Sequence, residues 1–359
     1  MRSPSLSCLP PCLSVFSVFE QGRLPLPVVP VSTQIEPVLV EALARVEARF
    51  ERQLRSDLPP VARLCRHIEG YRGKMLRPRL VLVCGMASGS AELSDSHITA
   101  AAVCEMIHMA TLVHDDVLDE AETRRRGTTV NGLHGNETAV ILGDYLIAAA
   151  YHLCSQLDSQ RTALLVAHVA MTLCAGELLQ LSHRAEFSLD EPTYFEIIER
   201  KTAALVALSC RLGAMCSGAD EGTAARMDRF GRKLGLAFQI QDDLLDLTGR
   251  QAVLGKPIGK DLGMGKLTLP VIHHLGIAGA RERGRSLLLL EEAAGGGARV
   301  SDAAGALVRA LDSTGSLAYA RRAAEGLVAE AKEELAAVEP SQARDLLLAM
   351  SEAVVSRSS

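Results

Sequence analysis

Residues 35–54 read IEPVLVEALARVEARFERQL, and the order of apolar and charged side chains in this stretch decides the fold. Apolar residues recur at spacings of three and four with charges on the opposite face, which is typical of an amphipathic helix. Similar helical patterns cover residues 74–88, 96–120, 136–158, 161–185, 192–217, 224–248, 267–295, 302–312 and 316–356. No stretch alternates as a strand would. The sequence therefore predicts one all-α domain over residues 34–359, with roughly ten helices or more.

The composition is that of a globular protein, with 48% hydrophobic and 23% charged residues. Aromatic residues make up only 3% and tryptophan is absent, so the core must be mainly aliphatic. Such a core suits packed helices better than sheets. The net charge is −5 and no run of basic residues forms a face, so nucleic acid is not an expected partner.

The cysteines predict the compartment. Nine are scattered along the chain, and several lie inside apolar helical patterns. Their odd number and unpaired spacing predict reduced, buried thiols in a cytoplasmic protein. No uninterrupted apolar run reaches eighteen residues, so we expect no transmembrane segment.

The first 33 residues differ from the rest, because they are rich in serine and proline and lack a helical period. We expect a disordered N-terminal extension or an over-long start. A secretory signal peptide is the alternative. Pro10 and Pro11 break its short apolar run, and no small-residue cleavage site stands out.

A dense acidic stretch, LVHDDVLDEAETRRRG, occupies residues 112–127. Asp115 and Asp119 are four residues apart, so on a helix they lie on one face, about 6 Å apart along the axis. Two carboxylates so placed repel each other unless a cation lies between them, and Mg²⁺ prefers such oxygen ligands. His108 falls on the same stripe, whereas Asp116 points away from it.

A second stretch, FQIQDDLLDLTG at residues 238–249, repeats the spacing with Asp242, Asp243 and Asp246. One such motif occurs by chance on solvated acidic helices. Two copies, each flanked by apolar residues that would bury them, favour metal binding over two solvated faces.

Basic residues accompany both acidic stretches: Lys74, Arg77, Arg124, Arg125, Lys201, Lys256, Lys260 and Lys266. Each taken singly is an ordinary surface residue. Arginine forks match phosphate oxygens and lysine adds a point charge, so the set predicts a ligand with two polyphosphate groups. A nucleotide P-loop is excluded, because GKDLGMGKLT lacks the first glycine at the required spacing and has Leu267 where serine or threonine should stand.

At this point the chain resembles the trans-isoprenyl diphosphate synthases, the polyprenyl synthetase family. The segments that carry the resemblance are YRGKMLRP, HDDVLDEAETRR, the Lys201-Thr202 pair, FQIQDDLLD and GKPIGKDLGMGKLTLP. They are co-linear with the family's motifs over roughly residues 35–356. The resemblance implies a large helical bundle around a central apolar cavity, with about three Mg²⁺ ions in the site.

The same resemblance implies roles for individual residues. Metal ligands would be Asp115, Asp119, Asp242 and Asp246, and the catalytic set Asp115, Asp116, Asp119, Lys201, Asp242 and Asp243. The allylic diphosphate would contact Arg124, Lys201, Thr202, Gln239, Lys256 and Lys266. Isopentenyl diphosphate would contact Lys74, Arg77, His108 and Arg125. The chain reads Arg124-Arg125-Arg126-Gly127 where the family usually reads Arg-Arg-Gly-Lys, so which arginines bind phosphate stays open.

In this family, bulky residues just before the first aspartate motif close the floor of the pocket. Here the corresponding residues are Ala110 and Thr111, which are small and suggest an open tunnel. Close-packed alanines between helices are the competing explanation. The open tunnel implies a long product, of octaprenyl to decaprenyl type for a quinone side chain, with a geranylgeranyl or farnesyl diphosphate synthase as the alternative.

Two other classes share some of these features. A class I terpene cyclase would carry an Asn/Ser/Glu triad where this chain has its second set of aspartates, and it would not need Lys74 and Arg77. A non-catalytic partner subunit would be expected to have eroded aspartate motifs. The resemblance further suggests a homodimer and, for product release, a loose association with membranes.

Overall fold

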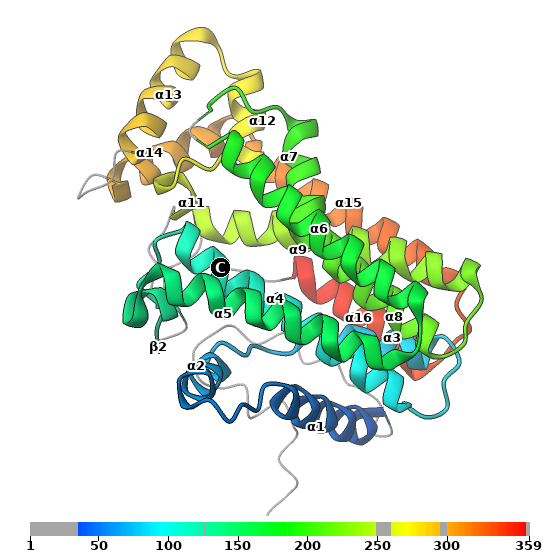
Figure 1. The fold of residues 1–359 in the computed structure, drawn as a ribbon. Coiled ribbons are helices and arrows are strands. Elements are labelled where there is room, and N and C mark those ends of the chain that lie inside the picture. Colours follow the sequence, from blue (N-terminus) through cyan, green and yellow to red (C-terminus); the bar gives the residue numbers. More distant parts are fainter. Residues whose placement is uncertain (1–34, 125–126, 185, 249–259, 295–299, 357–359) are drawn as a thin grey trace, which may run out of the picture.

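The computed structural model describes residues 35–124, 127–184, 186–248, 260–294 and 300–356, and helices dominate them (Figure 1). The helices up to the second aspartate motif are α1 (Ile35–Gln53), α2 (Pro59–Glu69), α3 (Leu76–Ala87), α4 (Asp95–Leu118), α5 (Val130–Cys154), η2 (Ser155–Leu157), α6 (Gln160–Ser182), α7 (Glu191–Ile198), η3 (Glu199–Ala203), α8 (Ala204–Cys216) and α9 (Glu221–Thr248). After it come α11 (Lys260–Gly263), α12 (Leu269–Ile277), α13 (Ala280–Ala294), α14 (Val300–Ser313), α15 (Ser316–Ala336) and α16 (Gln342–Val355). The predicted all-α fold is confirmed.

One small element interrupts the helices. Strands β1 (Thr123–Arg124) and β2 (Gly127–Thr128) pair antiparallel between α4 and α5. The sequence showed no alternation here, because two residues per strand are too few to produce a period. This hairpin directly follows the first aspartate motif.

Capping side chains and prolines mark the first turns of several helices. The hydroxyls of Thr129, Ser159 and Ser341 and the carboxylate of Asp190 accept backbone N–H groups in the first turns of α5, α6, α16 and α7. These caps satisfy donors that a helix N-terminus would otherwise leave unpaired. Proline near the start of α2, α7 and α12 costs no hydrogen bond there.

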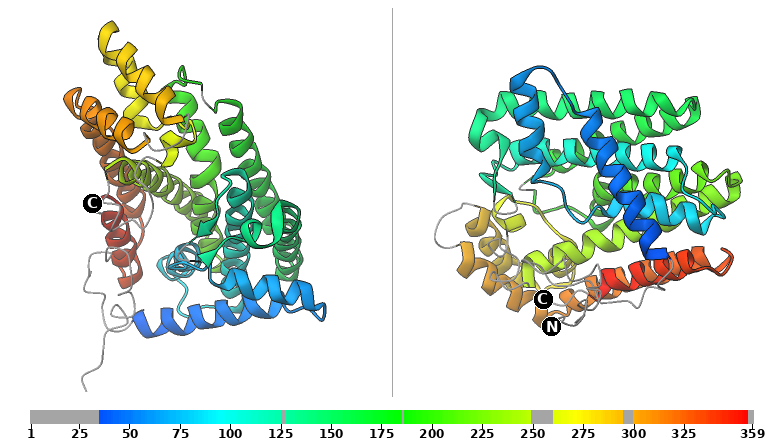
Figure 2. Two further views of the ribbon diagram at one scale, coloured as in Figure 1. Left: turned by 90° about the vertical axis from the view of Figure 1, so that its left-hand side faces the viewer. Right: turned by 90° about the horizontal axis from the view of Figure 1, so that it is seen from below.

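Helices α4 and α8 form the centre of the core. Helix α8 packs against α3, α4, α6 and α9, and α4 also contacts α1 and α5 (Figures 1 and 2). The α3–α8 crossing is close at Gly213, where an added Cβ would lie 2.2 Å from the Val81 carbonyl oxygen. Most of the buried side chains are Ala, Leu, Val and Ile, as the composition predicted.

The helix boundaries differ from the predicted ranges in several places. Helices α2 and α11 were missed, and α5 begins before its predicted start. The pattern at 267–295 is divided into α12 and α13, because Ala278 adopts an extended conformation before Gly279. The pattern at 316–356 is divided at Pro340, since proline cannot continue a helix. The predicted disordered extension, residues 1–33, lies outside the described residues.

The expectation that no segment is long and apolar enough to span a membrane was wrong. Helices α4, α5 and α6 are long and apolar enough to cross a membrane by length and composition. A search for uninterrupted apolar runs missed them, because each contains a few polar residues. The apolar window of α4 is 78% buried inside the molecule, whereas those of α5 and α6 are only 44% and 33% buried.

Two buried histidines bear on how the stability of the fold should depend on pH. His274 is fully buried, with Nδ1 2.9 Å from the Thr314 hydroxyl and Nε2 2.8 Å from that of Ser286. Burial lowers the pKa of His274, and it also lowers the pKa of His97. Both imidazoles therefore favour the neutral form in the folded chain.

We predict that the free energy of unfolding falls as the pH drops below about 6.5. Below this pH the two histidines take up protons in the unfolded chain more readily than in the folded chain, where their pKa is lowered. Each histidine should contribute about 1.4 kcal/mol per unit of pKa depression. The measurement is the urea midpoint at pH 7.5 and pH 5.5. The His274→Gln variant should be less stable at pH 7.5 but lose less on acidification, and an equal loss in both proteins would contradict the prediction.

Candidate active site

The ends of several helices enclose a cavity of about 240 Å³. It lies between the C-terminal parts of α4, α6 and α9, the helix pair α7–η3, and the segment from α11 to α12. Predicted site residues that line it are Asp115, Asp119, Lys201, Thr202, Gln239, Asp242, Asp243, Asp246 and Lys266. Residues that are distant in sequence therefore meet at one place.

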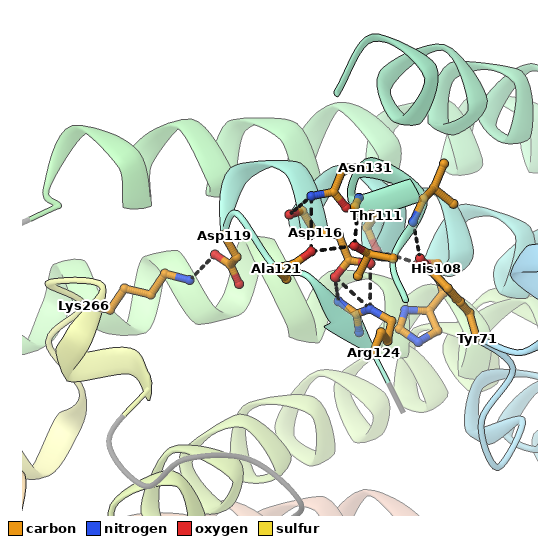
Figure 3. A network of polar contacts seen from close by, with 12 residues as sticks. Tyr71, His108, Thr111, Asp116, Asp119, Ala121, Arg124, Asn131 and Lys266 are labelled. Carbon is orange, nitrogen blue, oxygen red and sulfur yellow. Dashed lines mark hydrogen bonds and ion pairs between the residues drawn. The ribbon is translucent and has the colours of Figure 1, made fainter. Parts of the chain in front are cut away.

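Helix α4 supplies two carboxylates to this cavity. Asp115 lies in its last turn and Asp119 is its C-terminal cap. Burial raises the pKa of Asp115, and nearby Glu177 and Asp119 raise it further, against the lowering effect of Lys201. The Lys266 ammonium donates to Oδ1 of Asp119 at 2.9 Å (Figure 3). These carboxylates thus stand in a partly desolvated site that favours a cation.

Lys201 and Thr202 lie on the π-helical turn η3, a geometry that often marks functional positions. Gly176 of α6 permits close approach to this turn, since an added Cβ would lie 2.8 Å from the Lys201 backbone nitrogen. The Lys201 ammonium forms an ion pair with Glu177 and donates to Gln180 at 2.9 Å. Burial alone would lower the pKa of Lys201, but Asp115 and Glu177 raise it, so the side chain is a fixed positive charge.

Helix α9 supplies the second set of carboxylates. Asp242 is exposed to the cavity, whereas Asp243 is buried. The Tyr194 hydroxyl donates to Asp243 at 2.7 Å, and the Gln239 amide donates to it at 2.8 Å. Thr202 in turn donates to Gln239 at 2.7 Å. Asp243 therefore holds Tyr194 and Gln239 in place, while Asp242 and Asp246 present their carboxylates to the cavity.

Asp116 faces away from the cavity. Its buried carboxylate accepts from Nε and Nη2 of Arg124, at distances of 2.8 to 3.0 Å (Figure 3). Arg124 lies on β1, and its guanidinium is 5.8 Å from the centre of the Tyr71 ring. The structure thus gives Asp116 a positioning role toward Arg124, and neither residue lines the cavity.

Of the residues assigned to isopentenyl diphosphate, His108 lies on α4 itself, about two turns before Asp115. His108 is close to Tyr71 and Arg124 in Figure 3, on the side away from Lys266. Lys74 precedes α3 and Arg77 lies in its first turn. The Nε atom of Arg77 is buried without a hydrogen bond among the described residues. Arg125 and Lys256 lie outside the described residues.

A comparison with protein families identifies the chain. The polyprenyl synthetase family model matches residues 59–304, which include both aspartate motifs. The chain belongs to the polyprenyl synthetase family. This membership confirms the resemblance seen in the sequence and makes the protein a prenyltransferase.

Individual relatives agree with the family. Over 237 residues, 66% of this chain and 73% of the relative, it is 40% identical to heptaprenyl diphosphate synthase component 2 of Geobacillus stearothermophilus. A decaprenyl diphosphate synthase from Rhodobacter capsulatus superposes with a TM-score of 0.83 at 32% identity, over 90% of this chain and 98% of that one. A polyprenyl synthase from Caulobacter crescentus, complexed with calcium and isoprenyl diphosphate, gives 0.82 at 30% identity, over 89% and 97%. Geranylgeranyl diphosphate synthases also match, whereas the heptaprenyl and decaprenyl diphosphate synthases among these relatives support long-chain trans-prenyltransferase activity.

The donor set of this polyprenyl synthetase fits a divalent metal of the Mg²⁺ type. Within the described ranges, no three histidine, cysteine or carboxylate groups converge closely enough to hold an ion alone. Asp115 and Asp119 nevertheless face the same cavity as Asp242 and Asp246. Mg²⁺ usually takes one or two carboxylates and completes its shell with water and substrate phosphates. The arrangement therefore suits ions shared with a diphosphate.

The two chain-length positions do not line this cavity. Ala110 is fully buried, and the Thr111 hydroxyl donates to the His108 carbonyl at 2.8 Å. Their part in setting product length stays a prediction.

Sequence reasoning missed several cavity residues of this synthetase: Gln180, His183, Arg184, Tyr194 and Asp261, together with Glu177 behind Lys201. Glu177 and Gln180 were detectable in principle, as polar residues three apart in an otherwise apolar helix. Tyr194 and Arg184 carried no local signal. Only packing brings them to the site.

Proposed function

We propose that the protein condenses isopentenyl diphosphate with an allylic diphosphate and extends the chain to a long all-trans polyprenyl diphosphate, of octaprenyl to decaprenyl type. One observation carries this proposal. Two aspartate-bearing helices, α4 and α9, face a single cavity that also contains Lys201 and Lys266. The heptaprenyl and decaprenyl products named for its relatives support the long-chain reading.

In this proposal the two diphosphates bind at neighbouring positions along α4, so that the allylic carbon and the isopentenyl double bond can meet. Lys201, Thr202, Gln239 and Lys266 hold the allylic diphosphate in the cavity. Arg124, oriented by Asp116, helps to hold the allylic diphosphate from the hairpin, while Lys74, Arg77 and His108 bind isopentenyl diphosphate. Arg125 and Lys256 complete the two sets by resemblance to the family.

The cavity residues also account for the chemistry. Bound Mg²⁺, about three ions by family resemblance, supplies positive charge that stabilises the departing diphosphate. Lys201 and Lys266 are already oriented toward that charge, so little reorganisation is needed. Leu189, Ile197 and Ile198 line the same cavity and exclude water from the allylic cation. The double bond of isopentenyl diphosphate then attacks the cation, and the departed diphosphate takes up the proton whose loss restores an alkene.

The test is a product assay with purified protein, Mg²⁺, labelled isopentenyl diphosphate and farnesyl diphosphate, resolved by chain length. We expect Mg²⁺-dependent products well beyond twenty carbons. Products that stop at twenty or fewer would support the alternative, a geranylgeranyl or farnesyl diphosphate synthase. No incorporation by the chain alone would indicate a component that needs a partner subunit.

A second assay tests the chain-length positions. We predict that Thr111→Phe shortens the main product by one or more five-carbon units, because a bulky ring on the Asp115 face would obstruct the growing chain. The matched variant Thr138→Phe, at a half-buried position on α5 that does not line the cavity, should leave the ladder unchanged. An unchanged ladder in both variants would move the floor of the tunnel elsewhere.

We propose further that the chain forms a homodimer through α5 and α6. Leu164, Met171 and Leu178 are 64 to 71% exposed, and their seven-residue spacing places them on one stripe of α6. Ile141 on the adjoining α5 is 68% exposed. Monomers rarely expose contiguous apolar surface of this kind without a partner. This surface and the long apolar windows of α5 and α6 are also where a loose membrane association would occur.

Sedimentation analysis tests the dimer. We expect a wild-type dimer and a monomeric Ile141→Glu/Met171→Glu double variant, because two buried charges per protomer would oppose the contact. Leu288→Glu, at an equally exposed leucine on α13, should remain dimeric. A wild-type monomer, or a dimeric double variant, would contradict the proposal.

The cytoplasmic location stays a proposal as well. The cysteines within the described residues, Cys65, Cys84, Cys104, Cys154, Cys174, Cys210 and Cys216, are free thiols, and most are buried. Burial raises the pKa of Cys104 to about 12, so this thiol stays protonated and unreactive.

A further inference from the structure

Arg184 lies on the turn that follows α6 and lines the cavity. Its Nη2 atom is 3.9 Å from Oδ1 of Asp119. The same nitrogen donates to the Leu118 carbonyl at 3.4 Å, at the C-terminal end of α4. The side chain remains 36% exposed. None of the motifs that relate this chain to its family includes this residue.

The charges around Asp119 show why Arg184 matters. Lys266 donates to Oδ1 of Asp119, and Arg184 approaches the same oxygen from a different segment. Two full positive charges therefore stand beside one carboxylate at the cavity wall. Asp115 faces the same cavity, and once Mg²⁺ neutralises the two carboxylates both cations would be left facing the ligand, so this corner suits an additional anion.

The preceding residue, His183, does not supply a second positive charge to Asp119. Its Nδ1 atom is 2.6 Å from Glu186, so its ring is engaged with a carboxylate of its own turn. Arg184 is the cation of that turn that reaches Asp119. A guanidinium has five donors in a planar fork, which matches two phosphate oxygens at once.

We propose that Arg184 is a further diphosphate-binding residue of this site, contacting the allylic diphosphate from the α6 side. The proposal rests on the proposed function, because it takes the cavity as the allylic diphosphate site. The Leu118 carbonyl holds the guanidinium near the end of α4, so that the side chain is ordered before the ligand binds. Such ordering lowers the entropic cost of binding.

The competing explanation is structural: Arg184 would only connect the end of α6 to the end of α4. The two explanations predict different effects of removing Arg184 on the binding of anions and of metal ions. If Arg184 binds diphosphate, its loss weakens anion binding. The same loss removes a positive charge that repels a metal ion from Asp119, so Mg²⁺ alone should bind as well or better.

Calorimetric titration with Mg²⁺ alone, and with inorganic pyrophosphate in saturating Mg²⁺, distinguishes them. Arg184→Gln should bind pyrophosphate about tenfold more weakly than wild type, as expected for one lost charge-assisted contact. Arg184→Lys should recover part of the affinity, because it retains the charge but not the fork. Arg161→Gln, at the other end of α6 where Arg161 pairs with Glu221, is the matched control and should bind as wild type.

The outcomes separate the two proposals. Wild-type protein that binds no pyrophosphate with Mg²⁺ would overturn both the role of Arg184 and the proposed diphosphate site. Normal binding by wild type and binding within twofold by Arg184→Gln would overturn the role of Arg184 alone. Thermal unfolding of each variant identifies a loss of folding. If Arg184→Gln does not fold, Arg184→Lys decides, and an affinity equal to that of wild type would contradict the proposal.

Discussion

Replacing Asp115 with asparagine is expected to lower kcat by roughly a thousandfold, the scale seen when one group that stabilises charge in a transition state is removed. Asp115 is a partly desolvated carboxylate beside Asp119, Glu177 and Lys201. Asparagine keeps the shape but loses the charge that would hold a metal ion. The Lys201 ammonium would keep its contacts with Glu177 and Gln180, so the local fold should survive.

The measurement is kcat as a function of Mg²⁺ concentration, with removal of the metal by a chelator and its return as reference. The matched control is Asp312→Asn on α14, an exposed aspartate that does not line the cavity. It should have wild-type kinetics. If Asp115→Asn retained more than a tenth of the wild-type kcat at saturating Mg²⁺, Asp115 would not hold a metal ion that the rate-limiting step requires.

Replacing Gly213 with alanine should lower the free energy of unfolding by about 3 kcal/mol, near the upper end for an overpacked core. The added Cβ would lie 2.2 Å from the Val81 carbonyl oxygen and 3.0 Å from the Gly85 nitrogen. Both atoms belong to the backbone of α3, so no side chain can turn aside to relieve the clash. Helix α3 would have to move away from α8.

Gly326→Ala on α15 is the matched control, because an added Cβ there meets no atom within 4 Å. Alanine is the better helix former by about 0.5 to 1 kcal/mol, so this variant should be slightly more stable than wild type. Urea unfolding of the three proteins gives both values. Equal stability of the two variants would show that α3 can move away from α8 at a smaller cost in free energy than the close contact indicates.

Much of the site followed from spacing and chemistry along single helices. The four-residue interval between Asp115 and Asp119 and the repeat of aspartates at Asp242 and Asp246 predicted two faces able to share metal ions. The structure places both pairs around one cavity. Helix type was equally predictable, since the apolar period of three and four extends over most of the chain.

Other features depend on contacts between residues distant in sequence. Tyr194 reaches Asp243 from 49 residues away, and Lys266 reaches Asp119 from 147 residues away. Asp116 appears in the motif as one more acid, yet the hairpin turns Arg124 back onto it and makes it a partner for that arginine. No periodicity predicts which carboxylate an arginine will choose.

The amino-acid sequence alone therefore determined which segments are helices and which faces of those helices are apolar or charged. These properties depend on residues three and four positions apart. Tertiary packing alone decided how the helices close around the cavity, through close approaches such as that at Gly176 and through partners such as the half-buried Glu177 and the buried Tyr194. The physical reason is the range of the interactions. Helical periodicity acts within a turn, whereas desolvation and ion pairing act between any groups that the fold brings together.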